Sequence, residues 1–147
     1  MSSHRPHALE IKSLAFGWTE GPPLLNIPTL TIKAGESVFL EGPSGSGKST
    51  LLSLISGVTP PQIGTLRVLD TDIAALSAAG RDTFRANRLG SIFQLFNLVP
   101  YLSVMDNVLL PCRFSPDRAK RVTEEKGSVK EAAADLLSRL GLSAMAD

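Results

Sequence analysis

The chain has few of the residues on which several classes of protein depend. Its 147 residues include one cysteine and two histidines. A lone Cys112 excludes an internal disulfide and a metal site built from cysteines, and it fits a reducing compartment. Both histidines, His4 and His7, lie in a polar N-terminal stretch where solvation is expected. With so few bases available, a Ser-His-Asp or Cys-His catalytic set is not expected.

Charge and long apolar runs are also scarce. The formal net charge is +1 with 20% charged residues, so no broad basic field predicts binding to nucleic acid or to an anionic membrane surface. The N-terminal stretch has no apolar core like that of a signal peptide, and no run approaches about 18 apolar residues. These features predict a soluble, cytoplasmic chain with enough hydrophobic residues, 43%, to build a core.

A glycine-rich stretch in the first half of the chain fits G-x-x-x-x-G-K-[ST], the Walker A phosphate-binding loop. Dense phosphate charge is best approached by bare backbone N–H groups, and glycines permit the turn and the close contact. Lys48 is expected to reach the β- and γ-phosphates, Ser49 to hold Mg²⁺, and Thr50 to lie near the α-phosphate. The residues expected to bind nucleotide here are Gly42, Pro43, Ser44, Gly45, Ser46, Gly47, Lys48, Ser49 and Thr50.

The flanking sequence predicts the strand, loop and helix that this motif needs. Residues 37–40 indicate a buried strand, and a helix from the loop to about Ser56 is expected to stop at Gly57. Before them, alternating apolar residues predict a strand near 8–14 and a second strand around Leu30 and Ile32. An antiparallel layer is therefore expected to precede the nucleotide-binding core.

The remaining pattern predicts further short elements. Expected strands are 64–70 and 89–93, and expected helices are 78–87, with Ser77 as its N-cap, and 129–140. The segment that follows residues 89–93 is expected to be divided into short pieces by three prolines, Pro100, Pro111 and Pro116. Asp70 follows Leu66-Arg67-Val68-Leu69 and is a weak candidate for an acidic metal-shell residue. Because Arg67 interrupts the apolar run, a charged turn is the preferred interpretation.

With these motifs in place, the chain resembles the ATP-binding subunit of ATP-binding-cassette (ABC) transporters, most closely the subgroup serving lipoprotein release and macrolide export. Four stretches carry the resemblance: residues 24–36, the Walker A loop, the Q-loop Ile92-Phe93-Gln94-Leu95-Phe96-Asn97-Leu98-Val99-Pro100, and Ser103-Val104-Met105-Asp106-Asn107-Val108. The family likeness implies ATP and Mg²⁺ as ligands, with Lys48 and Gln94 as catalytic residues. It also implies that Gln94 and Ser49 contact the metal.

Two further roles follow from the same resemblance. An aromatic residue before the loop stacks on adenine in this family, which implies Trp18, with Phe16 as the second choice. Residues from about 94 to 108 would face a membrane-spanning transporter subunit. The ATPase would then be peripheral at the inner face of the membrane, and its full-length parent would be a homodimer.

Several family motifs do not occur in this sequence: the Leu-Ser-Gly-Gly-Gln signature, the Walker B aspartate with its catalytic glutamate, and the switch histidine. The resemblance therefore implies a truncated α/β fold. A P-loop NTPase (RecA-like) core with an N-terminal antiparallel layer would occupy about 1–94, and the Q-loop with the start of a helical subdomain about 95–147. Hydrolysis by this chain alone is not expected, and a marginal, aggregation-prone protein is expected because the strands near Val38 and Ile92 would lose neighbours.

Two alternatives stay open at this point. The chain could be an inactive fragment that only binds nucleotide, or a different P-loop protein such as a small kinase or GTPase. The second alternative is disfavoured, since neither guanine-reading Asn/Lys-Asp elements nor an arginine-bearing lid is evident in the sequence.

Overall fold

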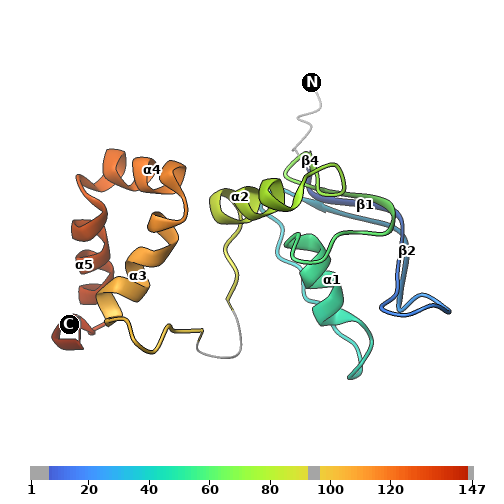
Figure 1. Cartoon of the computed structure of the whole chain (residues 1–147), viewed down its shortest axis with the longest axis horizontal. Helices are drawn as coiled ribbons and strands as arrows, with labels where there is room; N and C mark the ends of the chain where they lie inside the picture. The colour runs from blue at the N-terminus through green and yellow to red at the C-terminus, as the bar shows by residue number, and fades with distance from the viewer. Residues whose placement is uncertain (1–6, 93–96, 146–147) are drawn as a thin grey trace. The chain divides into compact units, whose positions relative to one another are not determined.

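The computed structural model describes residues 7–92 and 97–145, and the chain divides into two compact units, 1–82 and 83–147 (Figure 1). This division falls within helix α2 (Ala78–Arg88), upstream of the boundary near residue 94 that the Q-loop suggested. Because residues 93–96 lie outside the described ones, the expected boundary stays a prediction. Each unit is described by itself below.

The first unit is built on an antiparallel sheet, as the alternating sequence predicted. Its strands are β1 (His7–Phe16), β2 (Leu25–Lys33), β3 (Ile63–Val68) and β4 (Thr71–Asp72), in the order β2-β1-β3-β4 (Figure 1). Strand β1 lies in the middle and pairs with β2 on one side and β3 on the other. Both long pairs are antiparallel, so the predicted antiparallel layer is confirmed.

The buried face of β1 changes phase halfway along the strand. Leu9 and Ile11 are buried, and then Leu14 and Phe16 are buried in the opposite phase. Such a shift needs one extra residue, and the pairing shows where it lies: Lys12 pairs with Thr65 and Ala15 with Ile63, so two residues of β1 oppose the single Gly64. Ser13 takes a left-handed φ of 50° at this bulge. The bulge therefore keeps both halves of β1 in one core.

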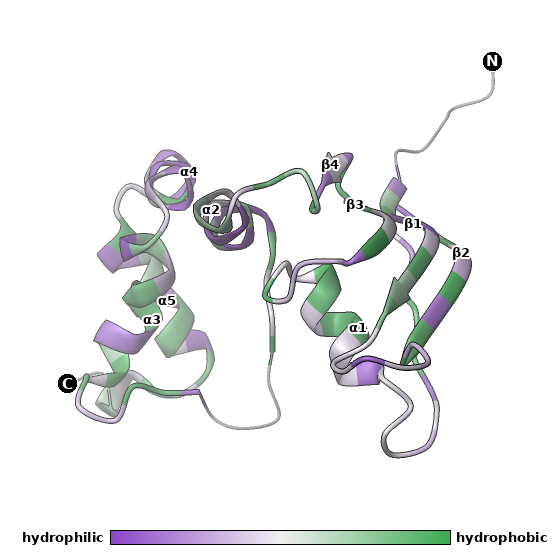
Figure 2. Cartoon of the chain, turned by 45° about the vertical axis from the view of Figure 1, so that its right-hand side comes forward, coloured by the Kyte–Doolittle hydropathy of each residue, from purple (hydrophilic) through white to green (hydrophobic). Residues whose placement is uncertain are grey.

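Helix α1 (Lys48–Ile55) begins inside the phosphate-binding loop, as predicted. Its Leu51 and Leu54 are buried together with the apolar face of the sheet, and the two elements lie alongside each other in Figures 1 and 2. The helix ends just before Gly57, which has a φ of 70° and whose N–H donates to the carbonyl of Leu54. The predicted glycine stop is confirmed.

Strands β3 and β4 are joined by a tight turn whose two central residues, Leu69 and Asp70, both have positive φ. The guanidinium of Arg67 donates to the carbonyl oxygen of Asp70 at 2.7 Å and helps to hold this conformation. Asp70 is exposed in this turn. The structure therefore agrees with the interpretation of Asp70 as a charged turn residue.

The strands predicted over 37–40 and 89–93 are not found in the described residues. Val38, Phe39 and Leu40 have no regular secondary structure and pair with no described strand, and Phe39 is 87% exposed. Residues 89–92 form no strand either, Ile92 is fully exposed, and Phe93 lies outside the described part of the chain. An apolar stretch becomes a strand only when another strand satisfies its backbone, and no described strand pairs with these two segments.

The second unit is helical and contains α3 (Val104–Arg113), α4 (Pro116–Lys126), α5 (Val129–Arg139) and the short 3₁₀ helix η1 (Ser143–Met145). Each α-helix starts at a serine N-cap, Ser103, Ser115 or Ser128, whose side chain accepts from the backbone N–H three residues later. Ala133 and Leu137 of α5 are buried. The helix predicted over 129–140 is thus confirmed.

The prolines divide this segment at two of the three predicted points. Pro100 lies in the turn before α3, and Pro116 is the first residue of α4, whereas Pro111 lies inside α3, two residues before its last residue. At that first position the missing N–H has no helical partner to lose, and the fixed φ suits a helix. Ser115 caps α4 and is fully buried. Of the three prolines, Pro111 alone departs from the predicted division, because it lies within a helix.

We predict that Gly64→Ala destabilises the protein strongly. Gly64 has a φ of 89°, and a Cβ atom there would lie 2.3 Å from the carbonyl oxygen of Ser13. Gly35→Ala is the matched control, because Gly35 has a φ of 82° but open space around it. Urea unfolding should show a loss of about 1–3 kcal/mol for the control, from the strained φ alone, and a larger loss for Gly64→Ala. Equal losses would mean that the close approach at the bulge is unimportant.

We also predict that the isolated chain self-associates through the exposed apolar segment 37–40. An exposed apolar stretch whose backbone is unpaired is a template for pairing with another chain. Phe39→Lys should reduce light scattering at a given protein concentration, whereas Phe114→Lys, at a residue 74% exposed near the end of α3, should change it less. A wild-type chain that stays monomeric at high concentration would contradict this prediction.

Candidate functional site

The phosphate-binding loop closes around the ammonium group of Lys48. The Nζ atom of Lys48 donates to the carbonyl oxygens of Gly42 at 2.6 Å and Pro43 at 2.8 Å, and it lies 3.5 Å from the hydroxyl of Ser46. These contacts curl the loop over the start of α1. A positive charge is thereby held at the centre of the loop, next to the positive end of the helix dipole.

Glycine is required at the point where the loop enters the helix. Gly47 is the N-cap of α1 with a left-handed φ of 88°, and no side chain caps the first turn. A Cβ atom at Gly47 would lie 2.6 Å from the buried side chain of Leu25, and one at Gly42 would lie 2.8 Å from the hydroxyl of Ser46. Because no side chain caps this first turn, its N–H groups could donate to an anion.

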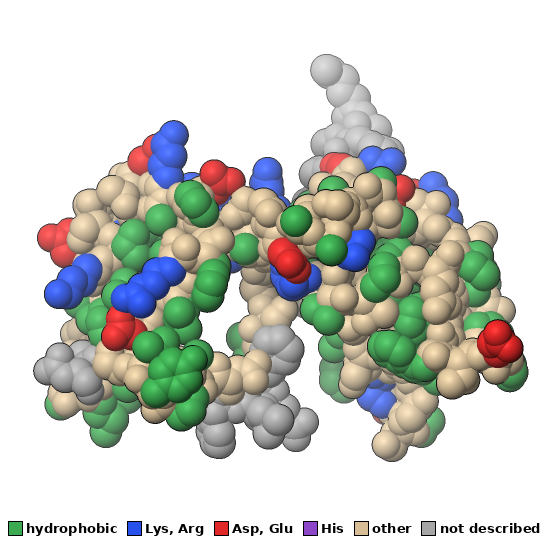
Figure 3. All heavy atoms as spheres, in the orientation of Figure 1, with side chains coloured by type: hydrophobic (Ala, Val, Ile, Leu, Met, Phe, Trp, Pro, Cys, Tyr) green, Lys and Arg blue, Asp and Glu red, His purple; other side chains and the backbone are tan. Residues whose placement is uncertain are grey.

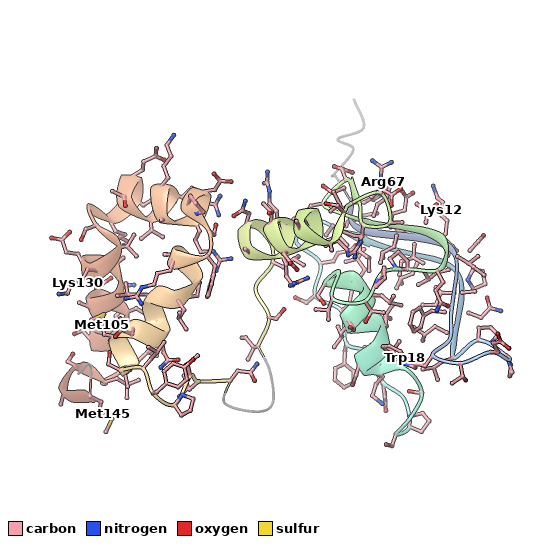
Figure 4. The ribbon with its side chains drawn as sticks, in the orientation of Figure 1. Lys12, Trp18, Arg67, Met105, Lys130 and Met145 are labelled. Atoms are coloured by element: carbon pink, nitrogen blue, oxygen red, sulfur yellow. The ribbon has the colours of Figure 1, made fainter. Side chains whose placement is uncertain are left out.

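Trp18 is tied to the same helix by its indole ring. Its Nε1 donates to the hydroxyl of Thr50, 3.3 Å away, in the first turn of α1, and Figure 4 shows Trp18 beside that turn. The ring of Phe16 meets it edge to face, with the ring centres 5.0 Å apart and the planes at 87°. Trp18 is 63% exposed and Phe16 is 3% exposed. Of the two predicted candidates, Trp18 is therefore the ring that a ligand can reach.

Gln62 is a site residue that the sequence analysis missed. Its carboxamide makes two hydrogen bonds to one residue: the N–H of Gly17 donates to Oε1 at 3.1 Å, and Nε2 donates to the carbonyl oxygen of Gly17 at 2.9 Å. The side chain thus holds the turn that carries Trp18. No motif marks this glutamine, because the contact joins positions that are 45 residues apart.

A shallow hollow of about 430 Å³ opens beside Trp18. Its lining comes from the end of β1, the turn that follows it and the start of β3, including Phe16, Trp18, Gln62 and Ile63. The hollow is mixed in character, with apolar rings and a polar carboxamide. This combination suits a flat heteroaromatic group that stacks on one face and has polar edges.

Of the two residues predicted to contact Mg²⁺, one is among the described residues and one is not. Among the described residues, no group of three His, Cys, Asp or Glu residues could hold a metal ion. Ser49 is exposed in the first turn of α1, where its hydroxyl is accessible to a hydrated Mg²⁺ that is already bound to phosphate. Gln94, the other predicted metal ligand, lies outside the described residues. Ser49 is therefore compatible with the predicted Mg²⁺, and no group of three acidic, His or Cys ligands is found among the described residues.

The segment after the Q-loop is organised by a single side chain, Asn107 of α3. Its amide oxygen accepts from the N–H of Val99 at 2.8 Å, and its Nδ2 donates to the carbonyl oxygens of Val99, Leu102 and Ser103 at 3.0–3.2 Å. Leu98 and Tyr101 are left 63% and 85% exposed. In the described part of the predicted partner-facing segment, Asn107 thus holds the backbone of residues 99–103, and apolar groups are exposed. Hydrophobic side chains are visible over the same unit in Figure 3.

A protein-family model described as "ABC transporter" matches residues 25–147. The chain belongs to this family. The four stretches that carried the resemblance to ATP-binding-cassette ATPases therefore identified the family correctly. Within residues 7–92 and 97–145, no helix is both long enough and apolar enough to cross a membrane.

Individual relatives give the extent of the similarity. The methionine import ATP-binding protein MetN of Caulobacter vibrioides is 42% identical over 126 residues, covering 86% of this chain and 36% of MetN. An ABC transporter ATP-binding protein of Mycobacterium tuberculosis is 35% identical over 142 residues, covering 95% of this chain and 54% of that protein. Because one relative is an importer component, the similarity is not confined to the predicted lipoprotein-release and macrolide-export subgroup.

The solved structures agree on the fold. A dimeric ATP-binding cassette in a post-hydrolysis state with ADP and phosphate is 32% identical, with a TM-score of 0.65, over 79% of this chain and 54% of that one. The predicted P-loop NTPase class, with an antiparallel layer and helices, is confirmed. The chain spans about one third to one half of the length of these relatives.

We predict that Asn107→Ala loosens the segment 97–103. The four hydrogen bonds that Asn107 makes would be lost, and the carbonyl groups they satisfy would turn to solvent. Hydrogen exchange of the Val99 amide should rise by about tenfold or more, in line with the loss of about 1–2 kcal/mol of local protection. Amides in the middle of α5 serve as the internal control, and equal acceleration there would indicate general unfolding instead.

Proposed function

We propose that this chain binds ATP, as part of the ATPase of an ABC transporter that couples nucleotide binding and hydrolysis to transport by a membrane subunit. The observation that carries the proposal is the Lys48 ammonium held by loop oxygens over an uncapped helix start. In the bound state, phosphate oxygens would take the place of the Gly42 and Pro43 carbonyls as acceptors. The N–H groups around Gly47 would then hydrogen-bond to the phosphates.

The base would lie in the hollow beside Trp18. The Trp18–Thr50 hydrogen bond places the exposed indole at the first turn of α1, the same turn that would hold the phosphates. One nucleotide can therefore be contacted by both parts of the first unit. Mg²⁺ would bind between the phosphates and the Ser49 hydroxyl, and Gln94 would complete the contact to metal and attacking water.

Hydrolysis by this chain alone is not part of the proposal. Phosphoryl transfer to water needs a group that orients the water and charges that stabilise the transition state. In the described residues, the loop offers Lys48 but no acidic cluster. We propose that a longer cassette supplies the carboxylate, and that the 147 residues alone bind nucleotide with negligible turnover.

The partner surface is the finer part of the proposal. Residues from about 94 to 108 would face a membrane-spanning subunit, with Leu98 and Tyr101 among the exposed contacts. The parent ATPase would act as a homodimer at the inner face of the membrane, as the dimeric form of the related solved cassette supports. Lipoprotein or macrolide export stays the proposed substrate subgroup because of the four stretches that carry the resemblance, and methionine import by a relative is the competing indication.

Calorimetric titration with ATP, in the presence and absence of Mg²⁺, tests the binding proposal. Lys48→Ala should weaken ATP binding by about 100-fold, because it removes a charge-assisted contact worth about 1.5–3 kcal/mol and frees the loop. Lys33→Ala, at the end of β2, is the matched loss of a lysine and should bind like the wild type.

The same preparations test turnover. Phosphate release should not exceed the background for either protein. If the wild type and Lys48→Ala bound ATP equally, the proposed site would be wrong. If the wild type hydrolysed ATP and Lys48→Ala did not, a carboxylate of this chain would have to serve in catalysis.

A further inference from the structure

We propose that Gln62 is a positioning residue of the nucleotide site: its carboxamide fixes the turn after β1 so that Trp18 can stack on the base. The proposal deepens the ATP-binding function and rests on it. Gln62 would not act on the phosphates, and its role would be confined to the base half of the site.

The two hydrogen bonds between Gln62 and Gly17 resemble one more backbone pair added to the end of the β1–β3 ladder. The last β1–β3 pair is Ala15 with Ile63, and β1 ends at Phe16. Gly17 lies just beyond the strand, where its N–H and carbonyl have no strand partner. The planar amide of Gln62 satisfies both groups, with hydrogen bonds of 3.1 and 2.9 Å. The side chain thus continues the ladder by one residue.

These two hydrogen bonds stabilise the main chain at Gly17, the residue before Trp18. The following turn contains Gly21, Pro22 and Pro23 and has no regular structure, so its own backbone does little to orient the indole. On the ring itself, the structure provides the 3.3 Å hydrogen bond to Thr50 and the edge contact with Phe16. If the Gln62 hydrogen bonds to Gly17 were lost, these two contacts would remain, but the main chain before Trp18 would no longer be held.

The conformation of the phosphate loop does not depend on the hydrogen bonds between Gln62 and Gly17. Lys48 is held by Gly42, Pro43 and Ser46, and α1 is anchored by buried leucines of its own. Loss of the Gln62 amide should therefore weaken the contact with the base and leave the contact with the phosphates unchanged. A ligand that has phosphates but no base separates the two halves of the site.

The test compares ATP with inorganic tripolyphosphate, each with Mg²⁺, on the full 147-residue chain. Gln62→Leu removes both hydrogen bonds at similar size and should weaken ATP binding by about tenfold, with tripolyphosphate affinity kept within about twofold. Gln62→Glu keeps the acceptor for the Gly17 N–H but sets a second oxygen against the Gly17 carbonyl, and it should weaken ATP binding as well. Trp18→Ala should give the same split between the two ligands.

Trp18 is the only tryptophan of the chain, so its fluorescence reports directly on the position of the indole. In the ligand-free protein, Gln62→Leu should shift the emission towards that of a fully hydrated indole. Asn26→Leu, which removes an exposed amide from β2 of the same sheet, is the matched control and should change neither the emission nor either affinity.

The outcomes separate this inference from the function on which it rests. If Gln62→Leu bound ATP like the wild type, or lost ATP and tripolyphosphate equally, the positioning role would be overturned while ATP binding stood. If Gln62→Leu showed the split and Trp18→Ala did not, Gln62 would act on the base without Trp18, and the proposal would again be wrong. If the wild type bound neither ligand, the proposed function and this inference would both fail.

Discussion

The close approach of two backbones at Gly64 and Ser13 is the constraint on which the rest of the first unit depends. A side chain at Gly64 would collide with the Ser13 carbonyl, so the bulge in β1 can form only opposite a glycine. The bulge lets β1 bury residues of both phases, and it sets Ala15 opposite Ile63. Gln62 then falls next to the end of β1 and can hold the turn that carries Trp18.

The proposed nucleotide site consequently depends on local contacts in the first unit. The strand predicted to enter the phosphate loop, 37–40, is unpaired, yet the loop is closed by its own hydrogen bonds to Lys48. On its other side, α1 is fixed by Leu51 and Leu54 in the core, and the Trp18 indole donates a hydrogen bond to Thr50 in its first turn. The arrangement explains how a chain that spans 36–54% of these relatives can present a complete phosphate loop.

Helix starts, helix ends and N-caps could be predicted from patterns within short stretches of the sequence. Contacts between residues far apart in the sequence could not. The Walker A spacing predicted the start of α1, Gly57 predicted its end, and Ser77 was found as the cap of α2, where its hydroxyl accepts from the N–H of Gly80. By contrast, the strand over 37–40 was predicted from hydrophobicity alone, and hydrophobicity does not tell whether a neighbouring strand exists. The Gln62–Gly17 pair depends on the register of two strands, which no local pattern specifies.

The central claim is that one nucleotide contacts both the phosphate loop and the Trp18 hollow. Photolabelling with 8-azido-ATP, followed by peptide mapping, tests this claim most directly. The label lies on the base, so the account predicts that it attaches to peptides lining the hollow, those containing residues 15–23 or 62–63. Unlabelled ATP should compete, and Lys48→Ala should abolish the labelling because the phosphates anchor the ligand. Labelling of peptides within 83–147, or labelling that persists in Lys48→Ala, would contradict the account.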